Sequence, residues 1–250
     1  MTPRTFSLLL LTALSLQGCG GGGSDAAAVP AATQEAETPA PPPEPVGISV
    51  DRSGLVIGTI TGFGSIFVNG VEYDTETATI LDDGRTIAET DLAVGDLVTV
   101  EGAISEDGAT GTAARVIFDA EVEGPVAALD VANASFVVLG RTVQVDGATV
   151  FAPDIVPRAV EGLAVGDRVE VSGLLAGDGA VLATRIERSD DPELEVKGFV
   201  AALDTAAATF RLGDLVVAYG NARRDDFEGA SLAEGQLVDV RGRGLDAAGA

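Results

Sequence analysis

The sequence predicts an all-β protein made of about three small β-barrels in tandem, preceded by a disordered N-terminal tether. The leading observation is a repeat. The segments Leu92–Gly102, Leu163–Gly173 and Leu232–Gly242 each place a Gly-Asp or Gly-Gln turn before valines that alternate with polar residues. Their glycines are evenly spaced, since 166 − 95 = 71 and 235 − 166 = 69. A fixed period of this kind indicates an array of one structural unit, and the alternation indicates half-buried strands.

Composition supports the same fold class. Apolar residues make up 46% of the 250 residues, but aromatic residues only 4%, so the cores must consist mainly of Val, Leu, Ile and Ala. β-Branched residues of this kind suit strands. The 32 glycines and 11 prolines indicate frequent turns between short strands.

The net charge and the residue types present limit the classes of function that the chain can have. The formal charge is −24, with a single lysine, Lys197, and no histidine. Such a field repels phosphate backbones, and the aromatic residues that stack on single strands are scarce, so we expect no nucleic-acid partner. The lack of histidine removes the commonest general base, and we expect a non-catalytic protein without a cofactor.

Residues 1–18 read as a lipoprotein signal peptide. Arg4 supplies the positive charge, and an apolar run of eleven residues, Phe6 to Leu16, follows it. That run is too short for a membrane span of about 20 residues, but it fits a signal-peptide core. Leu16-Gln17-Gly18-Cys19 resembles the lipobox of bacterial lipoproteins, which implies lipidation of Cys19. An ordinary secretory signal with an incidental cysteine is the alternative.

Residues 19–53 are expected to form a disordered tether. The segment opens with Gly-Gly-Gly-Gly-Ser and ends in a proline-rich stretch, and it has no apolar periodicity. A lipid on Cys19 would hold the protein on a membrane. The residue after it is glycine, not an acidic residue, and in lipoproteins this implies the outer membrane, with the repeats facing the periplasm or the cell surface.

Three units follow the tether, at 54–120, 121–195 and 196–250. The first reads as a strand, a turn at Gly62-Phe63-Gly64-Ser65, a hairpin at Asn69-Gly70 and three further strands. The second and third repeat this order. The third lacks a closing strand, so we expect a fragment, a gap filled by another chain, or a frayed cap.

Residues 58–74 look like the signature of the family of domains of unknown function DUF5666, and the repeated Leu-x-x-Gly-Asp-x-Val-x-Val-x-Gly strand is shared with OB-fold-like barrels. The resemblance implies tandem OB-like β-barrels in a cell-envelope lipoprotein. It transfers no catalytic residues. The second and third units lack the Gly-Phe-Gly-Ser turn and are therefore degenerate members.

The sequence leaves a short set of candidate sites. We expect the turn Gly62, Phe63, Gly64 and Ser65 to form a binding loop. Asp82, Asp83, Asp107 and Asp178 lie in acidic turns and are candidates for calcium, which takes oxygen ligands, although such residues are also common in ordinary turns.

We therefore expect a non-catalytic envelope lipoprotein that binds an envelope protein or a polysaccharide. A passive spacer without a ligand is one alternative. A carboxylate-based hydrolase acting through residues such as Asp82 is another, because paired carboxylates can cleave glycosides without histidine.

Overall fold

The computed structural model describes residues 53–223 and 231–245. The expected signal peptide, Cys19 and almost all of the tether lie outside these residues. Within them the secondary structure consists of strands and three short 3₁₀ turns, which confirms the predicted all-β class. No helix in this part of the chain has the length and apolarity to cross a membrane.

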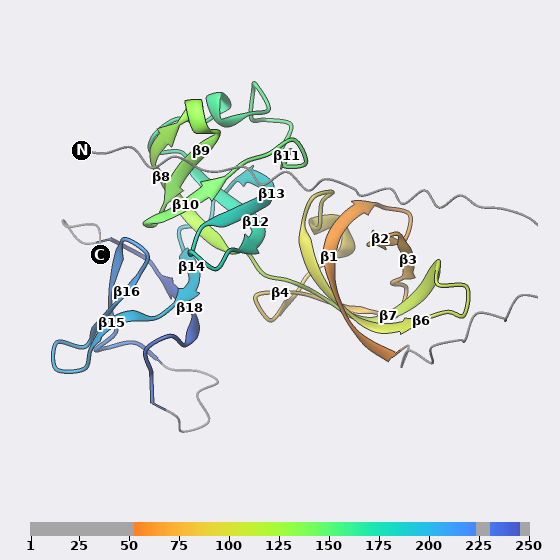
Figure 1. Cartoon of the computed structure of the whole chain (residues 1–250). Helices are drawn as coiled ribbons and strands as arrows, with labels where there is room; N and C mark the ends of the chain where they lie inside the picture. The colour runs from red at the N-terminus through yellow and green to blue at the C-terminus, as the bar shows by residue number, and fades with distance from the viewer. Residues whose placement is uncertain (1–52, 224–230, 246–250) are drawn as a thin grey trace, which may run out of the picture. The chain divides into compact units, whose positions relative to one another are not determined.

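The first repeat forms a closed barrel of five strands (Figure 1). Its strands are β1 (Ser53–Gly62), β2 (Ile66–Val68), β3 (Val71–Asp74), β6 (Leu97–Ile104) and β7 (Thr110–Phe118). Neighbours around the barrel run β1-β2-β3-β7-β6 and back to β1, and β3 and β7 pair in parallel. This Greek-key order is OB-like. β4 (Thr79–Asp82) extends the sheet beside β7, and β5 (Arg85–Thr86) pairs with β4.

The second repeat closes in the same way. It contains β8 (Val122–Asp130), β9 (Ser135–Val138), β10 (Arg141–Gln144), β12 (Arg168–Leu175) and β13 (Val181–Arg188), with β11 (Val150–Phe151) in the place of β4. Its barrel order is β8-β9-β10-β13-β12 and back to β8, again with one parallel pair, β10–β13. Two tandem OB-like barrels are therefore confirmed.

The third repeat differs from the expectation of a separate barrel. Its strands β14 (Leu194–Phe199) and β18 (Leu237–Gly242) extend the sheet of the second repeat, beside β8. β15 (Ala201–Asp204), β16 (Thr209–Leu212) and β17 (Leu215–Ala218) form a three-stranded sheet. The physical reason is that no described strand takes the place of β7 or β13, whose parallel pairing closes the other two barrels.

In each repeat the Gly-Asp or Gly-Gln turn is hydrogen-bonded to the equivalent residue of the first strand. The Gly95 N–H donates to the Ile60 carbonyl (2.9 Å), and the Ile60 N–H donates to the Asp96 carbonyl (2.8 Å). Val126 makes the same two bonds with the second turn, and Val200 makes them with the third. The side chain of Asp96 also accepts the Ala93 N–H (2.7 Å), as the side chains of Asp167 and Gln236 do in their own turns. Oxygen acceptors at this position hold the turn, which explains why the repeat keeps Asp or Gln there.

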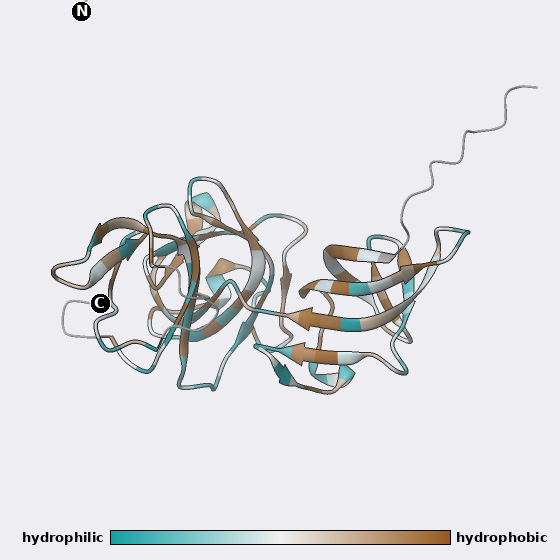
Figure 2. Cartoon of the chain, turned by 90° about the horizontal axis from the view of Figure 1, so that it is seen from below, coloured by the Kyte–Doolittle hydropathy of each residue, from teal (hydrophilic) through white to brown (hydrophobic). Residues whose placement is uncertain are grey.

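The alternating valines point inward. Val98 and Val100 on β6, and Val169 and Val171 on β12, are at most 1% exposed. Figure 2 shows the alternation of apolar and polar residues along the strands. The first repeat has its own core, whereas the second and third share one core, because Val122 of β8 and Val196 of β14 belong to the same cluster.

The first and second repeats meet at the first Gly-Asp turn. Asp96 lies 3.3 Å from the Arg185 guanidinium of β13, and Arg185 also donates to the Val94 carbonyl (3.1 Å). The Leu97 N–H donates to the Ser172 hydroxyl (2.7 Å). Burial raises the pKa of Asp96 to about 6, and the hydrogen bond from the Ala93 N–H and the charge of Arg185 offset this only in part. At the equivalent glycines, Gly166 and Gly235, an added methyl group would have no neighbour within 4 Å, so these two turns are open to solvent.

Candidate functional site

An apolar pocket of about 390 Å³ opens in the first repeat where β1 begins and β6 ends. Its apolar wall comes from Leu55, Val56, Val100 and Ile104, and Tyr73 of β3 also lines it. The turn between β6 and β7 contributes Ser105 and Glu106. The volume falls within the range of about 300–1,000 Å³ that is typical of ligand sites.

Tyr73 is a buried polar residue in the wall of this pocket. The side chain is 1% exposed, and its hydroxyl has no hydrogen-bond partner among the described residues. Burial raises the pKa of the phenol, so the hydroxyl keeps its proton. Buried tyrosine hydroxyls usually find an acceptor. The pocket wall therefore suits an apolar group, and the Tyr73 hydroxyl lies buried beside it.

The expected binding loop lies elsewhere, at the turn between β1 and β2. Gly64 has a φ of 119°, which favours glycine. Phe63 is 41% exposed, while Ser65 is half-buried. The turn thus presents one aromatic ring to solvent, at the opposite end of β1 from the pocket. The corresponding segment of the second repeat is a 3₁₀ turn capped by Asp130 and has no aromatic residue.

The four calcium candidates lie at three separate turns, because Asp82 and Asp83 are adjacent. Asp107 accepts the Ala109 N–H (2.9 Å) and the Thr110 N–H (3.1 Å), and these bonds lower its pKa. Asp178 accepts the Ala180 N–H (3.1 Å) in the matching turn of the second repeat. Asp82 ends β4, and Asp83 begins the next turn. Among the described residues no group of three or more Asp, Glu, Cys or His side chains is placed to hold a metal ion.

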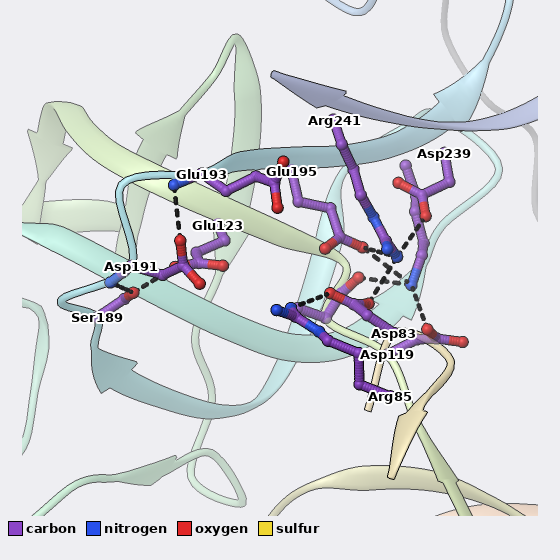
Figure 3. Close-up of polar contacts among 12 residues, drawn as sticks. Asp83, Arg85, Asp119, Glu123, Ser189, Asp191, Glu193, Glu195, Asp239 and Arg241 are labelled. Carbon is purple, nitrogen blue, oxygen red and sulfur yellow. Dashed lines mark hydrogen bonds and ion pairs between the residues drawn. The ribbon is translucent and has the colours of Figure 1, made fainter. Parts of the chain in front are cut away.

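Asp83 belongs to an ion-pair network that the sequence did not reveal (Figure 3). Arg241 of β18 lies 2.6 Å from Asp83, 2.8 Å from Asp239 and 3.4 Å from Glu195. Glu195 is 2% exposed and also lies 3.5 Å from Lys197. Burial raises the pKa of Glu195, and Lys197 and Arg241 act in the opposite direction. The positive charge of Arg241 therefore pairs with carboxylates of the same chain.

A second polar group covers the edge of β8. Ser189 donates to the Glu123 carboxylate, the Asp191 N–H donates to the Ser189 hydroxyl (3.0 Å), and the Glu193 N–H donates to Asp191 (2.8 Å). Figure 3 shows these side chains beside the Arg241 network. Both groups neutralise or hydrogen-bond carboxylates where β14 joins β8. They stabilise the joint between the second and third repeats, and the Arg241–Asp83 pair also links the third repeat to the first.

Four glutamates, Glu187, Glu170, Glu123 and Glu195, lie in a row on the neighbouring strands β13, β12, β8 and β14. Glu170 of β12 is directly opposite Glu187 of β13 on one side and Glu123 of β8 on the other. Glu187 is paired with Arg185 at 2.6 Å, and Glu123 is bonded to Ser189. Burial and the charges of Glu187 and Glu123 raise the pKa of Glu170 to about 8. Glu170 is therefore protonated at neutral pH.

The fold defines a tandem OB-like β-barrel protein, and the first barrel carries an apolar pocket. The family model described as "Domain of unknown function (DUF5666)" matches residues 54–117 and 123–187, which are the first and second repeats. The chain belongs to this family. A search of curated proteins finds no match.

Proposed function

We propose that the chain is a non-catalytic binding protein of the cell envelope, anchored through Cys19, and that its first repeat binds another envelope protein. The observation that carries this proposal is the apolar pocket with the Tyr73 hydroxyl, which has no partner among the described residues. An apolar side chain of a partner would fill the pocket and cover its apolar wall. Buried apolar anchors next to one well-placed polar group dominate the energy of many interfaces.

The pocket is tested by filling it. Gly54 lines the pocket, and a methyl group added there has no neighbour within 4 Å, so we expect Gly54→Leu to place its side chain in the pocket. Gly177 of the second repeat has equally open surroundings and provides the matched control, Gly177→Leu. We expect a pull-down from solubilised envelopes to recover a partner with the unchanged chain and with Gly177→Leu, but not with Gly54→Leu. Recovery of the same partner by all three would contradict the pocket.

The anchor is tested separately. Cys19→Ser should move the protein from the membrane fraction to the soluble fraction, because lipid chains supply the membrane affinity. Continued membrane retention of the variant would contradict the anchor. Absence of any specific partner, with the anchor intact, would favour a passive spacer.

Exposed Phe63 favours a polysaccharide as the second candidate. Its ring, 41% exposed at the β1–β2 turn, is free to stack on a sugar. Binding on a glycan panel that is lost in Phe63→Ser but kept in Gly54→Leu would assign the turn to polysaccharide. Hydrolysis on that panel, lost in Asp82→Asn, would instead revive the carboxylate-based hydrolase.

A further inference from the structure

One edge of β1 has no strand partner within the described residues. β6 pairs with one side of β1 over Ser53–Thr59, whereas β2 takes the other side only from Ile60 onward. On that free edge the Asn69 amide donates to the Ile57 carbonyl (2.9 Å). A row of free backbone groups on a sheet edge is a template for pairing with another strand.

The second repeat uses the equivalent edge. β14 of the third repeat pairs antiparallel with β8, with Val196 opposite Val122 and Glu195 opposite Glu123. The Lys197 N–H donates to the Glu121 carbonyl (3.0 Å) in the same ladder. This pairing merges the cores of the two repeats.

The β8–β14 pair joins equivalent positions of two repeats. Ile60, Val126 and Val200 make the same bonds to their Gly-Asp/Gln turns and are therefore equivalent. Four residues before each stands a valine, since 60 − 4 = 56, 126 − 4 = 122 and 200 − 4 = 196. The first strands of the second and third repeats, β8 and β14, therefore pair through equivalent residues, Val122 and Val196. Such a pair has an approximate two-fold axis between these two valines. The corresponding residue of the first repeat is Val56.

Side-chain chemistry favours the same pairing in the first repeat. The outward residues beside Val122 and Val196 are charged (Glu121, Glu123, Glu195 and Lys197), and Ser189 and Arg241 are needed to accommodate them. The matching residues of β1 are Leu55 and Ile57, which are 62% and 56% exposed. They carry no charge that would repel a partner. Pairing would remove their apolar surface from contact with water, which is favourable.

We propose that β1 pairs antiparallel with β1 of a second copy of this chain, about a two-fold axis at Val56. Leu55 of each copy lies opposite Ile57 of the other, and each Ile57 N–H donates to the opposite Leu55 carbonyl, as Lys197 does to Glu121. This contact between two chains has the same strand pairing as the contact between the second and third repeats within one chain. The contact shares Leu55 and Val56 with the wall of the pocket described above, but Ile57 does not line that pocket, so a substitution of Ile57 tests the strand pairing separately.

The pairing is expected to be weak and salt-dependent. One strand pair buries less than the roughly 1,200 Å² of a stable interface, and two chains of charge −24 repel each other at low ionic strength. Asn69 also competes for the Ile57 carbonyl. Its counterpart in the second repeat, Leu139, is apolar and 5% exposed, and its side chain cannot compete in this way. Because salt screens the repulsion between the two negatively charged chains, added salt should strengthen the dimer.

Sedimentation equilibrium of the full chain carrying Cys19→Ser tests the association, since that substitution removes disulfide dimers. We expect a monomer–dimer equilibrium with Kd of about 10–100 μM. Ile57→Glu should raise Kd at least about tenfold, because it places a charge opposite an apolar residue. Leu237→Glu is the matched control, as Leu237 of β18 is also 56% exposed, and it should leave Kd unchanged.

Disulfide trapping tests the register. In the Cys19→Ser background, Val56→Cys places the two cysteines opposite each other, about 4.5 Å apart between Cα atoms, within disulfide reach. Thr59→Cys places them about 20 Å apart, at roughly 3.3 Å per residue. We expect a cross-linked dimer from the first variant and none from the second. A monomer at about 1 mM in high salt, equal Kd values for Ile57→Glu and the unchanged chain, or equal cross-linking of the two cysteine variants would each overturn the proposal.

Discussion

Replacing Glu170 by glutamine should stabilise the second repeat in alkaline solution. Glu170 lies between Glu123 and Glu187 in the row of glutamates, and it has no ion pair among the described residues, whereas these two neighbours have partners. Its pKa of about 8, against 4.5 for the free side chain, corresponds to about 5 kcal/mol at about 1.36 kcal/mol per pKa unit. Because the carboxyl group is half-buried and not sealed from water, we expect about 1–3 kcal/mol to be measured.

The pH dependence gives the sign of this effect. A carboxyl whose pKa is raised on folding contributes stability that is fully present below pH 4.5 and is lost as the pH rises through about 8. Glu170→Gln should therefore melt at the same temperature as the unchanged chain at pH 4. At pH 9 it should melt higher by about 2–4 °C for each kcal/mol.

Calorimetry at both pH values measures this difference, with Glu161→Gln as the matched control, since Glu161 is exposed in a 3₁₀ turn of the same repeat. The control should not change the melting temperature at either pH. A lower melting temperature for Glu170→Gln at pH 9 would refute the reasoning, because it would mean that the ionised carboxylate stabilises the fold.

Three further substitutions test other parts of the structure. Val169→Asp places an unpaired charge at a site that is 0% exposed, so the second repeat should unfold, as followed by circular dichroism; an unchanged melting curve would show that Val169 is not in the core. Gly198→Ala would place a methyl group on the position of the Arg141 guanidinium, so limited proteolysis should cut the third repeat faster, while Gly242→Ala, with no neighbour within 4 Å, should not change the rate. Tyr73→Phe removes a buried hydroxyl without a described partner and should leave the free energy of unfolding unchanged or raise it by up to about 1 kcal/mol; a loss of more than about 1 kcal/mol in urea titration would reveal an acceptor for that hydroxyl.

The strands and turns were largely predictable because their signals are local. Asn69 and Gly70 have φ values of 52° and 81°, as a two-residue hairpin turn of this type requires. Leu139 shows the limit of that rule. It takes a φ of 46° at the same position without glycine or asparagine, because its side chain is buried against Gly124. Packing there outweighs the local backbone preference.

The candidate sites were less predictable, because they depend on which strands become neighbours. The row of glutamates joins four strands, and nothing in the sequence of any one strand specifies its register against the others. The pocket depends on the distance between the start of β1 and the β6–β7 turn. One signal was available: with the repeats aligned on their Gly-Asp/Gln turns, the first strands carry Leu55 and Ile57 in the first repeat, where the second has Glu121 and Glu123.

That contrast connects the fold to its surfaces. In the second repeat β14 pairs with the edge of β8 that carries the charged residues, and the cost of burying Glu123 and Glu195 is offset by Ser189, Lys197 and Arg241. In the first repeat the equivalent residues are apolar, and no described strand pairs with that edge. Charged residues thus occur where the chain supplies their partners, and apolar residues occur where a contact must come from outside the described residues. On this reasoning, exchanging Leu55 and Ile57 for glutamates should abolish self-association and leave the first barrel folded, because both side chains point away from its core.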